Sequence, residues 1–479
     1  MSRRRKNKKD LPVFERVQIY DAGAEGKAIA RVDNMVIFVP FGAPGDIVDI
    51  KVIGKRKSFY EGEIIGFHHY SDVRRSPKCE HFGLCGGCKW QHIEYGKQLY
   101  FKQKQVVDSF ERIGKIKIPA FQSIIPSESE YFYRNKLEFS FSNRKWLTDI
   151  SSENINDTTT NGLGMHLPRM FDRIVDLENC YLQKEPSNSI RLFLRDYGIK
   201  RNLTFYDSRN HHGFLRNVTI RTASTGQTMV IISFGYDDNN EIAELVNQLS
   251  TAFPQITSLF TVINQKRNDT IYDLALNPAH GKPYITEMLE NLEFKVGPLS
   301  FFQTNTEQAL VLYKIVRQFG SFKGNELVYD LYCGTGTITC FVAKGVKSIV
   351  GIDNVPEAID DARENSNLNG IFNTAFVVGD LATTLNSDFV IKYGAPDVII
   401  TDPPRSGMHP KVIKQILEIL PEKIIYVSCN PATQARDISL LAERYLLAEI
   451  QPVDMFPQTH HVENVSLLIK KSLISEQLV

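Results

Sequence analysis

The first hydrophobic segments of the chain are short, rich in β-branched residues and separated by glycines. Within residues 12–68 the runs 36–40 and 47–53 are the clearest of these segments. Regularly spaced short strands with turn residues between them are typical of a small barrel. We therefore predict a β-barrel over residues 12–68. Its tip at 54–58 carries Lys55, Arg56 and Lys57 in one turn, which indicates either a phosphate contact or a solvated hairpin end.

The central part of the chain mixes strand and helix patterns. A helix-like stretch covers 94–112, and strand-like runs at 137–141, 217–221 and 229–233 precede a helical pattern at 240–253. The polar tract 151–161 is typical of a surface loop. Together these patterns predict an α+β region.

From about residue 295 the pattern becomes an alternation of strands and helices. Strand-like apolar runs lie at 327–330, 348–353, 397–402 and 423–428, with helical segments between them. Strands that alternate with helices indicate βαβ units and a parallel sheet. The last part of the chain is therefore predicted to be a Rossmann-like α/β domain.

Composition agrees with a folded, multidomain protein. Hydrophobic residues make up 42% and charged residues 23% of the 479 residues, which excludes a disordered or fibrous chain. At about 150 residues per domain, this length predicts roughly three domains. No apolar run approaches the roughly 18 residues of a membrane span, and the charged start indicates no signal peptide. We expect a soluble, cytoplasmic monomer.

The net charge of +1 conceals an uneven distribution. Residues 1–140 hold 25 Lys and Arg against 17 Asp and Glu, whereas the remaining residues hold 31 against 38. A basic front indicates a polyanionic partner, and a solvated tail combined with chance is the alternative. The basic arm 3–9 is predicted to be disordered and either contacts nucleic-acid phosphates or only solubilises the chain.

A glycine turn follows the predicted strand at 327–330. The sequence Asp-Leu-Tyr-Cys-Gly-Thr-Gly-Thr at 330–337 allows a tight turn with close backbone approach to a ligand. Asp353 ends the next strand, where a carboxylate can hold ribose hydroxyls. A dinucleotide site would need a third glycine near Thr339, and its absence favours S-adenosylmethionine over NAD. A glycine turn without any ligand is the alternative.

Two further motifs follow predicted strands of the same sheet. Asp-Pro-Pro-Arg at 402–405 forms a rigid turn at the edge where open α/β sheets bind ligands. Methyltransferases that act on amino groups commonly place an aromatic residue where Arg405 stands, so Arg405 argues against such a substrate. Cys429 follows the strand 423–428 and is either an inert buried thiol or a nucleophile at the ligand-binding edge.

Glu463 directly precedes the predicted strand 464–469, at its edge, and is either a general base, if it is partly desolvated, or an ordinary surface carboxylate. His460 and His461 precede it. Neighbouring residues of a strand point to opposite faces, so we do not expect these histidines to share a metal ion.

The cysteines predict a metal site rather than disulfides. Cys79, Cys85 and Cys88 cluster in the sequence, with two glycines between Cys85 and Cys88, and Cys180 is distant. Four thiolates bind either zinc or an iron–sulfur cluster, and the spacing does not decide between these two.

These motifs together resemble the RNA uridine-5-methyltransferase family. Its pattern is matched in order by Ser-Phe-Phe-Gln-Thr-Asn at 300–305, the glycine turn at 330–336, Asp-Pro-Pro-Arg at 402–405, Ser-Cys-Asn-Pro at 428–431 and His-Val-Glu at 461–463. The front resembles the branch of the family that modifies 23S ribosomal RNA. Residues 12–68 resemble its OB-like TRAM barrel, and Cys79, Cys85, Cys88 and Cys180 match its [4Fe-4S] ligands.

The resemblance implies a role for each matching residue. Cys429 would be the nucleophile, in a site that favours the thiolate, and Glu463 the base. The implied cofactor-binding residues for S-adenosyl-L-methionine are Gln303, Tyr332, Thr337, Asp353, Asp380 and Asp402. Phe301 or Phe302 would stack on RNA bases, and Gln303 would also touch the target uracil.

The expected organisation is therefore a multidomain α/β protein. It comprises a basic arm (1–11), a TRAM barrel (12–69), a central α+β domain with an iron–sulfur site (70–290) and a methyltransferase domain (291–479). The expected partner is 23S ribosomal RNA, gripped by the arm, the barrel tip and the basic residues Arg74, Arg75, Lys78 and Lys89. Transfer-RNA methylation is the first alternative, since enzymes of that type are expected to lack the barrel and cluster. A non-catalytic iron–sulfur RNA-binding or ribosome-assembly factor is the second.

Overall fold

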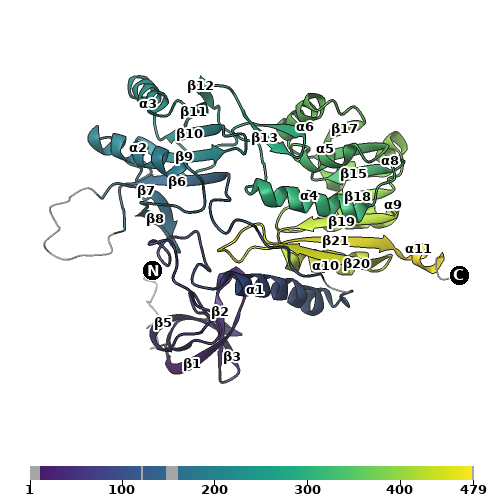
Figure 1. The fold of residues 1–479 in the computed structure, drawn as a ribbon, viewed down its shortest axis with the longest axis horizontal. Helices are drawn as coiled ribbons and strands as arrows, with labels where there is room; N and C mark the ends of the chain where they lie inside the picture. The colour runs from purple at the N-terminus through teal and green to yellow at the C-terminus, as the bar shows by residue number, and fades with distance from the viewer. Residues whose placement is uncertain (1–10, 120–121, 147–159, 477–479) are drawn as a thin grey trace, which may run out of the picture.

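The computed structural model describes residues 11–119, 122–146 and 160–476. Figure 1 shows a small barrel below two larger sheets, with helix α1 (Tyr95–Asp108) between the barrel and the C-terminal sheet. The predicted arm 3–9 lies outside the described residues, as does nearly all of the predicted loop 151–161. No helix in the described ranges has the length and apolar character needed to cross a membrane.

The N-terminal strands close into a barrel in the order β1-β2-β3-β5-β4, as the glycine-punctuated pattern predicted. The strands are β1 (Val13–Ala22), β2 (Ala28–Val32), β3 (Met35–Val39), β4 (Ile47–Lys55) and β5 (Phe59–His69), with a 3-10 turn, η1 (Ala24–Gly26), after β1. Their alternate apolar side chains, such as Ile19, Ile37 and Ile50, fill the interior because successive residues of a strand point to opposite faces. The basic tip is the turn between β4 and β5.

The central region is built on a mixed sheet in the order β12-β11-β10-β9-β6-β7-β8. Its strands are β6 (Lys136–Ser142), β7 (Gly162–Leu167), β8 (Met170–Asp176), β9 (Leu215–Thr222), β10 (Thr228–Phe234), β11 (Ile256–Ile263) and β12 (Asn277–Gly281). Helices α2 (Ser187–Lys200) and α3 (Asn239–Ala252) pack on it, and β13 (Ile285–Leu289) and β14 (Leu292–Val296) form a separate hairpin. Helix α1 continues as a π-helix, η2 (Ser109–Gly114). The predicted α+β character is confirmed.

The C-terminal sheet has the order β17-β16-β15-β18-β19-β21-β20. The parallel strands are β15 (Leu327–Leu331), β16 (Ser348–Asp353), β17 (Thr374–Val378), β18 (Val398–Thr401) and β19 (Lys423–Ser428), and β21 (Glu463–Lys470) and β20 (Tyr445–Val453) add an antiparallel edge. Helices cover both faces: α4 (Thr306–Gly320), α5 (Thr337–Ala343), α6 (Pro356–Leu368), α7 (Leu381–Thr384), α8 (Ser387–Tyr393), α9 (Pro410–Ile419) and α10 (Pro431–Leu441), and α11 (Lys471–Glu476) follows β21.

Neighbouring residues of the buried strands face opposite cores of this sheet. Val328 packs with α4 and α5 on one face, and Tyr329 packs with α9 and α10 on the other. The chain runs outward from β15 through β16 to β17 in one direction and from β18 to β19 in the other. The carboxyl ends of β15 and β18 therefore border the crevice where open α/β sheets bind ligands.

Candidate active site

One large cavity, about 1910 Å³, opens at the carboxyl ends of β15, β16, β18 and β19. Every catalytic and cofactor-binding residue expected from the sequence lines it: Gln303, Tyr332, Thr337, Asp353, Asp380, Asp402, Cys429 and Glu463. These residues are spread over 161 positions of the chain, from 303 to 463, and the sheet topology brings them to one edge. A cavity of this size takes more than one small ligand, since typical ligand pockets occupy about 300–1,000 Å³.

The glycine turn after β15 has an unusual backbone. Tyr332, Gly334 and Gly336 all have left-handed φ angles, of 63°, 52° and 74°. Such a conformation costs a tyrosine on the order of 1–3 kcal/mol, which the surrounding structure must offset. The Gly334 amide donates a 3.0 Å hydrogen bond to Asp353 Oδ2. The turn from β15 is thus tied to the carboxylate at the end of β16, and both border the cavity.

Two aspartates near the turn resist ionisation. Burial raises the pKa of Asp402 to about 7. Burial also raises the pKa of Asp330 to about 7, where the charges of Asp402 and Asp353 add to the effect and a hydrogen bond from Thr339 opposes it. Asp330 Oδ1 is buried without a hydrogen-bond partner. The sequence motifs assigned no role to Asp330. Its place as the first residue of the glycine-turn motif was the signal that could have identified it.

Cys429 lies just beyond β19, where Asn430 caps α10 through a hydrogen bond from the Ala432 amide. Burial and the negative charges of Glu463 and Asp402 raise the pKa of Cys429 to about 11, whereas Arg405 acts in the opposite direction. The protein groups by themselves therefore favour the neutral thiol, because burial disfavours the charged form and the two carboxyls together outweigh Arg405.

Glu463 is the first residue of β21, and its side chain is buried, with 4% of the residue exposed. Burial, with a contribution from Asp402, raises its pKa well above the usual range, and Arg405 again opposes the shift. The alternative of an ordinary surface carboxylate is excluded by this burial. A glutamate held in such a place accepts a proton far more readily than one in water.

Arg405 lines the cavity and contacts His461, which lies behind it in the segment before β21. Arg405 Nη2 lies 3.4 Å from His461 Nδ1, and the Arg405 carbonyl accepts a 3.0 Å hydrogen bond from Asn430 Nδ2. The two histidines precede β21 and do not lie in a strand, so the expected opposite orientation is wrong. The rings of His460 and His461 are 4.1 Å apart between centroids. Burial lowers the pKa of His460 to about 4 and that of His461 to about 3.

The two phenylalanines expected to meet RNA differ in their surroundings. Phe301 is 67% exposed and lines the cavity, whereas Phe302 is 5% exposed and packs in the core between the sheet and α4. Only Phe301 is therefore accessible to a base.

The four cysteines of the predicted metal site converge in one region. Burial raises the pKa of Cys85 to about 11 and that of Cys88 to about 12, and negative charge at Cys180 and Cys79 raises both further. Within the ranges that the structure describes, however, no group of three or more His, Cys, Asp or Glu residues is arranged to hold a metal ion. The predicted metal site is thus not confirmed by the geometry, although its four thiols are mutual neighbours.

The basic residues expected to grip RNA are only partly free. Arg74 makes a bidentate ion pair with the fully buried Asp46, with contacts of 2.8 and 2.7 Å, and Arg75 pairs with Glu130 at 2.6 Å. Lys78 is exposed, and its Nζ lies 4.9–5.0 Å from the ring centroids of three aromatic residues, Tyr131, Phe132 and Tyr181. The charge of Arg74 is thus engaged in holding the barrel to the segment after it, and the phosphate contact expected of Arg74 stays a prediction.

Comparison with known proteins decides the family. The profile described as tRNA (uracil-5-)-methyltransferase matches residues 280–471, and that of the TRAM domain matches residues 15–65. RNA methyltransferases of Bacteroides thetaiotaomicron and Porphyromonas gingivalis are 50% and 49% identical to this chain. The alignments cover 93% and 95% of it and 99% and 100% of those proteins. The chain belongs to the RNA uracil-5-methyltransferase family.

A solved structure resembles the whole methyltransferase. The tRNA (uracil-54, C5)-methyltransferase of Pyrococcus abyssi, crystallised with S-adenosyl-L-homocysteine, is 27% identical. It covers 95% of this chain and 99% of its own, with a TM-score of 0.73. A match of that extent includes the barrel. The expectation that transfer-RNA enzymes lack it is therefore wrong for this relative.

Proposed function

We propose that this enzyme methylates carbon 5 of a uridine in RNA, with Cys429 as the nucleophile and Glu463 as the base. The observation that carries the proposal is the strand register. Ser428 of β19 pairs with Asn464 of β21, so the next positions along the two antiparallel strands are Cys429 and Glu463. A thiol and a desolvated carboxyl thereby line the same cavity.

The reaction requires these two groups and a positive counter-charge. Carbon 5 of uracil is a poor nucleophile, and addition of the Cys429 thiolate at carbon 6 converts the ring to an enolate that reacts at carbon 5. After methyl transfer, Glu463 removes the proton left on carbon 5. The electron pair of that bond restores the ring double bond, and the Cys429 thiolate leaves carbon 6.

The cofactor edge of the cavity suits S-adenosylmethionine. We propose that the Asp353 carboxylate at the end of β16 holds ribose hydroxyls, a role supported by its place beside the left-handed turn at Gly334 and Gly336, where a ligand can approach the backbone. Gln303, Tyr332, Thr337, Asp380 and Asp402 line the same space. Bound there, the cofactor supplies a methyl group on a positively charged sulfur.

The raised pKa values mean that a bound cation changes the ionisation of the site before chemistry starts. Cys429, Glu463 and Asp402 all hold protons more tightly than usual. A positive charge held beside these groups lowers their pKa values, since it stabilises the ionised forms. We propose that the Cys429 proton passes to solvent when the site is loaded, and that Arg405, which lowers the pKa of Cys429, stabilises the thiolate that forms.

RNA is gripped, we propose, by the barrel and by the residues around the cavity mouth. Phe301 offers an exposed ring for stacking, and the turn of Lys55, Arg56 and Lys57 offers charge. The target base must leave its stack to reach Cys429, at a cost of a few kcal/mol that these contacts offset. We propose the same domain boundaries as before: the arm ends at residue 11, the barrel at 69 and the central domain at 290, and the methyltransferase domain follows.

We further propose that Cys79, Cys85, Cys88 and Cys180 bind a [4Fe-4S] cluster. Four neighbouring thiols with raised pKa values become thiolates only when cations neutralise them. A four-iron cluster is larger than a single ion and takes one cysteine on each iron, so its ligands lie farther apart than those of zinc. Such a cluster would order the RNA-binding surface.

Two RNA classes remain as targets. We propose 23S ribosomal RNA first, from the resemblance of the barrel and the four cysteines to that branch. Transfer RNA is the second candidate, and the resemblance to the Pyrococcus abyssi enzyme over 95% of the chain supports it.

Nucleoside mass spectrometry tests both targets. RNA from cells with and without the gene is separated into ribosomal and transfer pools, and 5-methyluridine is measured in each. Loss from the ribosomal pool alone supports the first target, and loss from the transfer pool alone supports the second. Unchanged 5-methyluridine in both pools, with no methyl transfer by the purified protein to any RNA, would leave only a binding role.

A further inference from the structure

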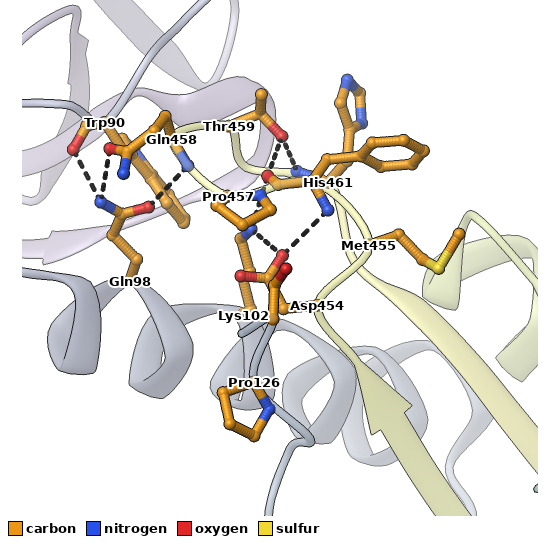
Figure 2. Close-up of polar contacts among 12 residues, drawn as sticks. Trp90, Gln98, Lys102, Pro126, Asp454, Met455, Pro457, Gln458, Thr459 and His461 are labelled. Atoms are coloured by element: carbon orange, nitrogen blue, oxygen red, sulfur yellow. Dashed lines mark hydrogen bonds and ion pairs between the residues drawn. The ribbon is translucent and has the colours of Figure 1, made fainter. Parts of the chain in front are cut away.

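Residues 454–461, here called the junction loop, connect β20 to the residues before Glu463. The loop begins directly after β20 and ends two positions before Glu463. Figure 2 shows it lying against helix α1 and the segment that follows the cysteines. Its polar groups are bonded mainly to residues outside the C-terminal sheet.

Lys102 of α1 and Asp454 of the junction loop form a fully buried ion pair. Both side chains are 0% exposed, and Lys102 Nζ lies 2.6 Å from Asp454 Oδ1 (Figure 2). Lys102 Nζ also donates to the Phe456 carbonyl at 2.9 Å, and the Tyr95 hydroxyl donates to Asp454 Oδ2 at 2.9 Å. Burial lowers the pKa of Lys102, and Asp454 opposes that shift. A buried charge is tolerated only with such partners, so the pair fixes where the loop starts.

Gln98, one turn earlier on α1, bonds reciprocally to Gln458. Gln98 Nε2 donates to Gln458 Oε1 at 3.0 Å, and the backbone N–H of Gln458 donates to Gln98 Oε1 at 3.0 Å. The Gln458 carbonyl accepts from the amides of Lys89 and Trp90 at 2.9 and 3.0 Å. These two residues directly follow Cys88. The cysteine segment, α1 and the junction loop therefore meet at one residue.

The opposite side of the loop is held by the methyltransferase domain. Asn305 Nδ2 donates to the Met455 carbonyl at 2.9 Å, and Gln308 Nε2 donates to the Asp454 carbonyl at 2.8 Å. Asn305 also caps α4, two residues after the cofactor-lining Gln303. The junction loop is thus fixed between helix α1 with the cysteine segment on one side and the methyltransferase domain on the other. It cannot move without breaking several buried hydrogen bonds.

We propose that Lys102 and Gln98 are positioning residues for Glu463. They hold the junction loop so that the Glu463 carboxyl stays opposite Cys429. The inference rests on the proposed role of Glu463 as the base that releases the covalent intermediate. Loss of either side chain lets the start of β21 shift, and a displacement of about 1 Å in a reacting group can lower a rate by about a hundredfold.

The intermediate offers a direct readout. Methyl transfer from cofactor labelled in its methyl group places the label on RNA that is joined to Cys429, and release of the adduct needs Glu463. After nuclease digestion and a denaturing gel, label that travels with the protein measures the unreleased adduct. A fold that is merely destabilised loses transfer and release together, whereas a displaced base retains transfer and slows release.

The experiment compares three variants on total RNA from cells lacking the gene. Glu463→Gln sets the signal for a missing base. Lys102→Met is expected to raise protein-bound label at least about tenfold over wild type while slowing turnover by a similar factor. Lys104→Met is the matched control, because Lys104 lies on the same helix and pairs with Asp21 and Asp108 without touching the junction loop.

The outcomes separate the inference from the function on which it rests. No protein-bound label with Glu463→Gln overturns the proposed role of the base. Label with Glu463→Gln but a wild-type level with Lys102→Met overturns the positioning role, as does an equal rise in Lys104→Met. If Lys102→Met does not fold, Gln98→Met, which removes both bonds to Gln458, takes its place. A raised level of protein-bound label then supports the positioning role, and a wild-type level overturns it.

Discussion

Cys429 and Glu463 each stand one position beyond Ser428 and Asn464, the last register pair of the antiparallel strands β19 and β21, and both line the cavity. The antiparallel edge is thus more than an extension of the sheet. A further parallel strand would place its own carboxyl end there, whereas β21 runs in the opposite direction and brings its first residue to the cavity. The proposed nucleophile and base are thus attached to neighbouring positions of the backbone. The charge of Glu463 also raises the pKa of Cys429.

Replacing Cys429 by alanine is expected to lower the rate of methyl transfer by at least about a thousandfold, because the variant lacks the thiolate that activates carbon 5. RNA binding should stay within about twofold of wild type, since the thiol supplies no charge to the phosphates. Transfer of labelled methyl groups and filter binding measure the two effects. Cys340→Ala, in the buried core of α5, is the control. Full transfer by Cys429→Ala would show that another residue is the nucleophile.

Removing the charge of Arg405 should move the pH dependence of methyl transfer. Arg405 lowers the pKa of Cys429, which burial, Glu463 and Asp402 raise to about 11. Without the cation the thiol pKa rises further, so less thiolate exists at a given pH. The rising limb of the rate profile should then shift to higher pH by on the order of one unit in Arg405→Gln.

Arg405→Lys keeps a positive charge and should keep most of the original profile. Superimposable profiles for wild type and Arg405→Gln, measured under single-turnover conditions, would contradict the electrostatic role of Arg405.

Adding a methyl group at Gly336 should harm both folding and cofactor binding. The residue has φ 74°, and a Cβ there would lie 2.9 Å from Ala362 Cβ. We expect Gly336→Ala to lower the free energy of unfolding by about 1–3 kcal/mol and to weaken cofactor binding. Gly370→Ala is matched in φ, at 63°, but has open space around it. Chemical denaturation and cofactor titration compare the two. Equal effects on cofactor affinity would show that the turn at Gly336 has no special part in binding.

The proposed iron–sulfur cluster should depend on each of its four thiols. If the wild-type protein, purified anaerobically, contains iron and sulfide as proposed, Cys88→Ser is expected to lose most of both, together with the visible absorbance, and to melt at a lower temperature. Metal analysis and thermal melting check this, with Cys340→Ala again as the control. A colourless wild-type protein with stoichiometric zinc would disprove the iron–sulfur proposal.

Local sequence patterns determined much of the architecture. Glycine-separated β-branched runs predicted the barrel, and the strand–helix alternation after residue 295 predicted the parallel strands, because these signals depend only on which side chains each strand or helix buries. The motif residues Asp353, Asp402 and Cys429 were found for a similar reason: each directly follows or ends an apolar run, and the ends of parallel strands meet at one edge.

Tertiary structure alone decided how these groups behave. The sequence placed Cys429 beside a strand but could not reveal that burial, Glu463 and Asp402 would raise its pKa, because the two carboxyls come from residues 34 and 27 positions away. It could not separate Phe301 from Phe302, or show that Arg74 is occupied by Asp46. Burial and charge pairing are properties of contacts between distant segments. Likewise, Lys102 and Asp454 are ordinary surface-type residues in the sequence, and only the packing of α1 against the junction loop makes them a buried pair.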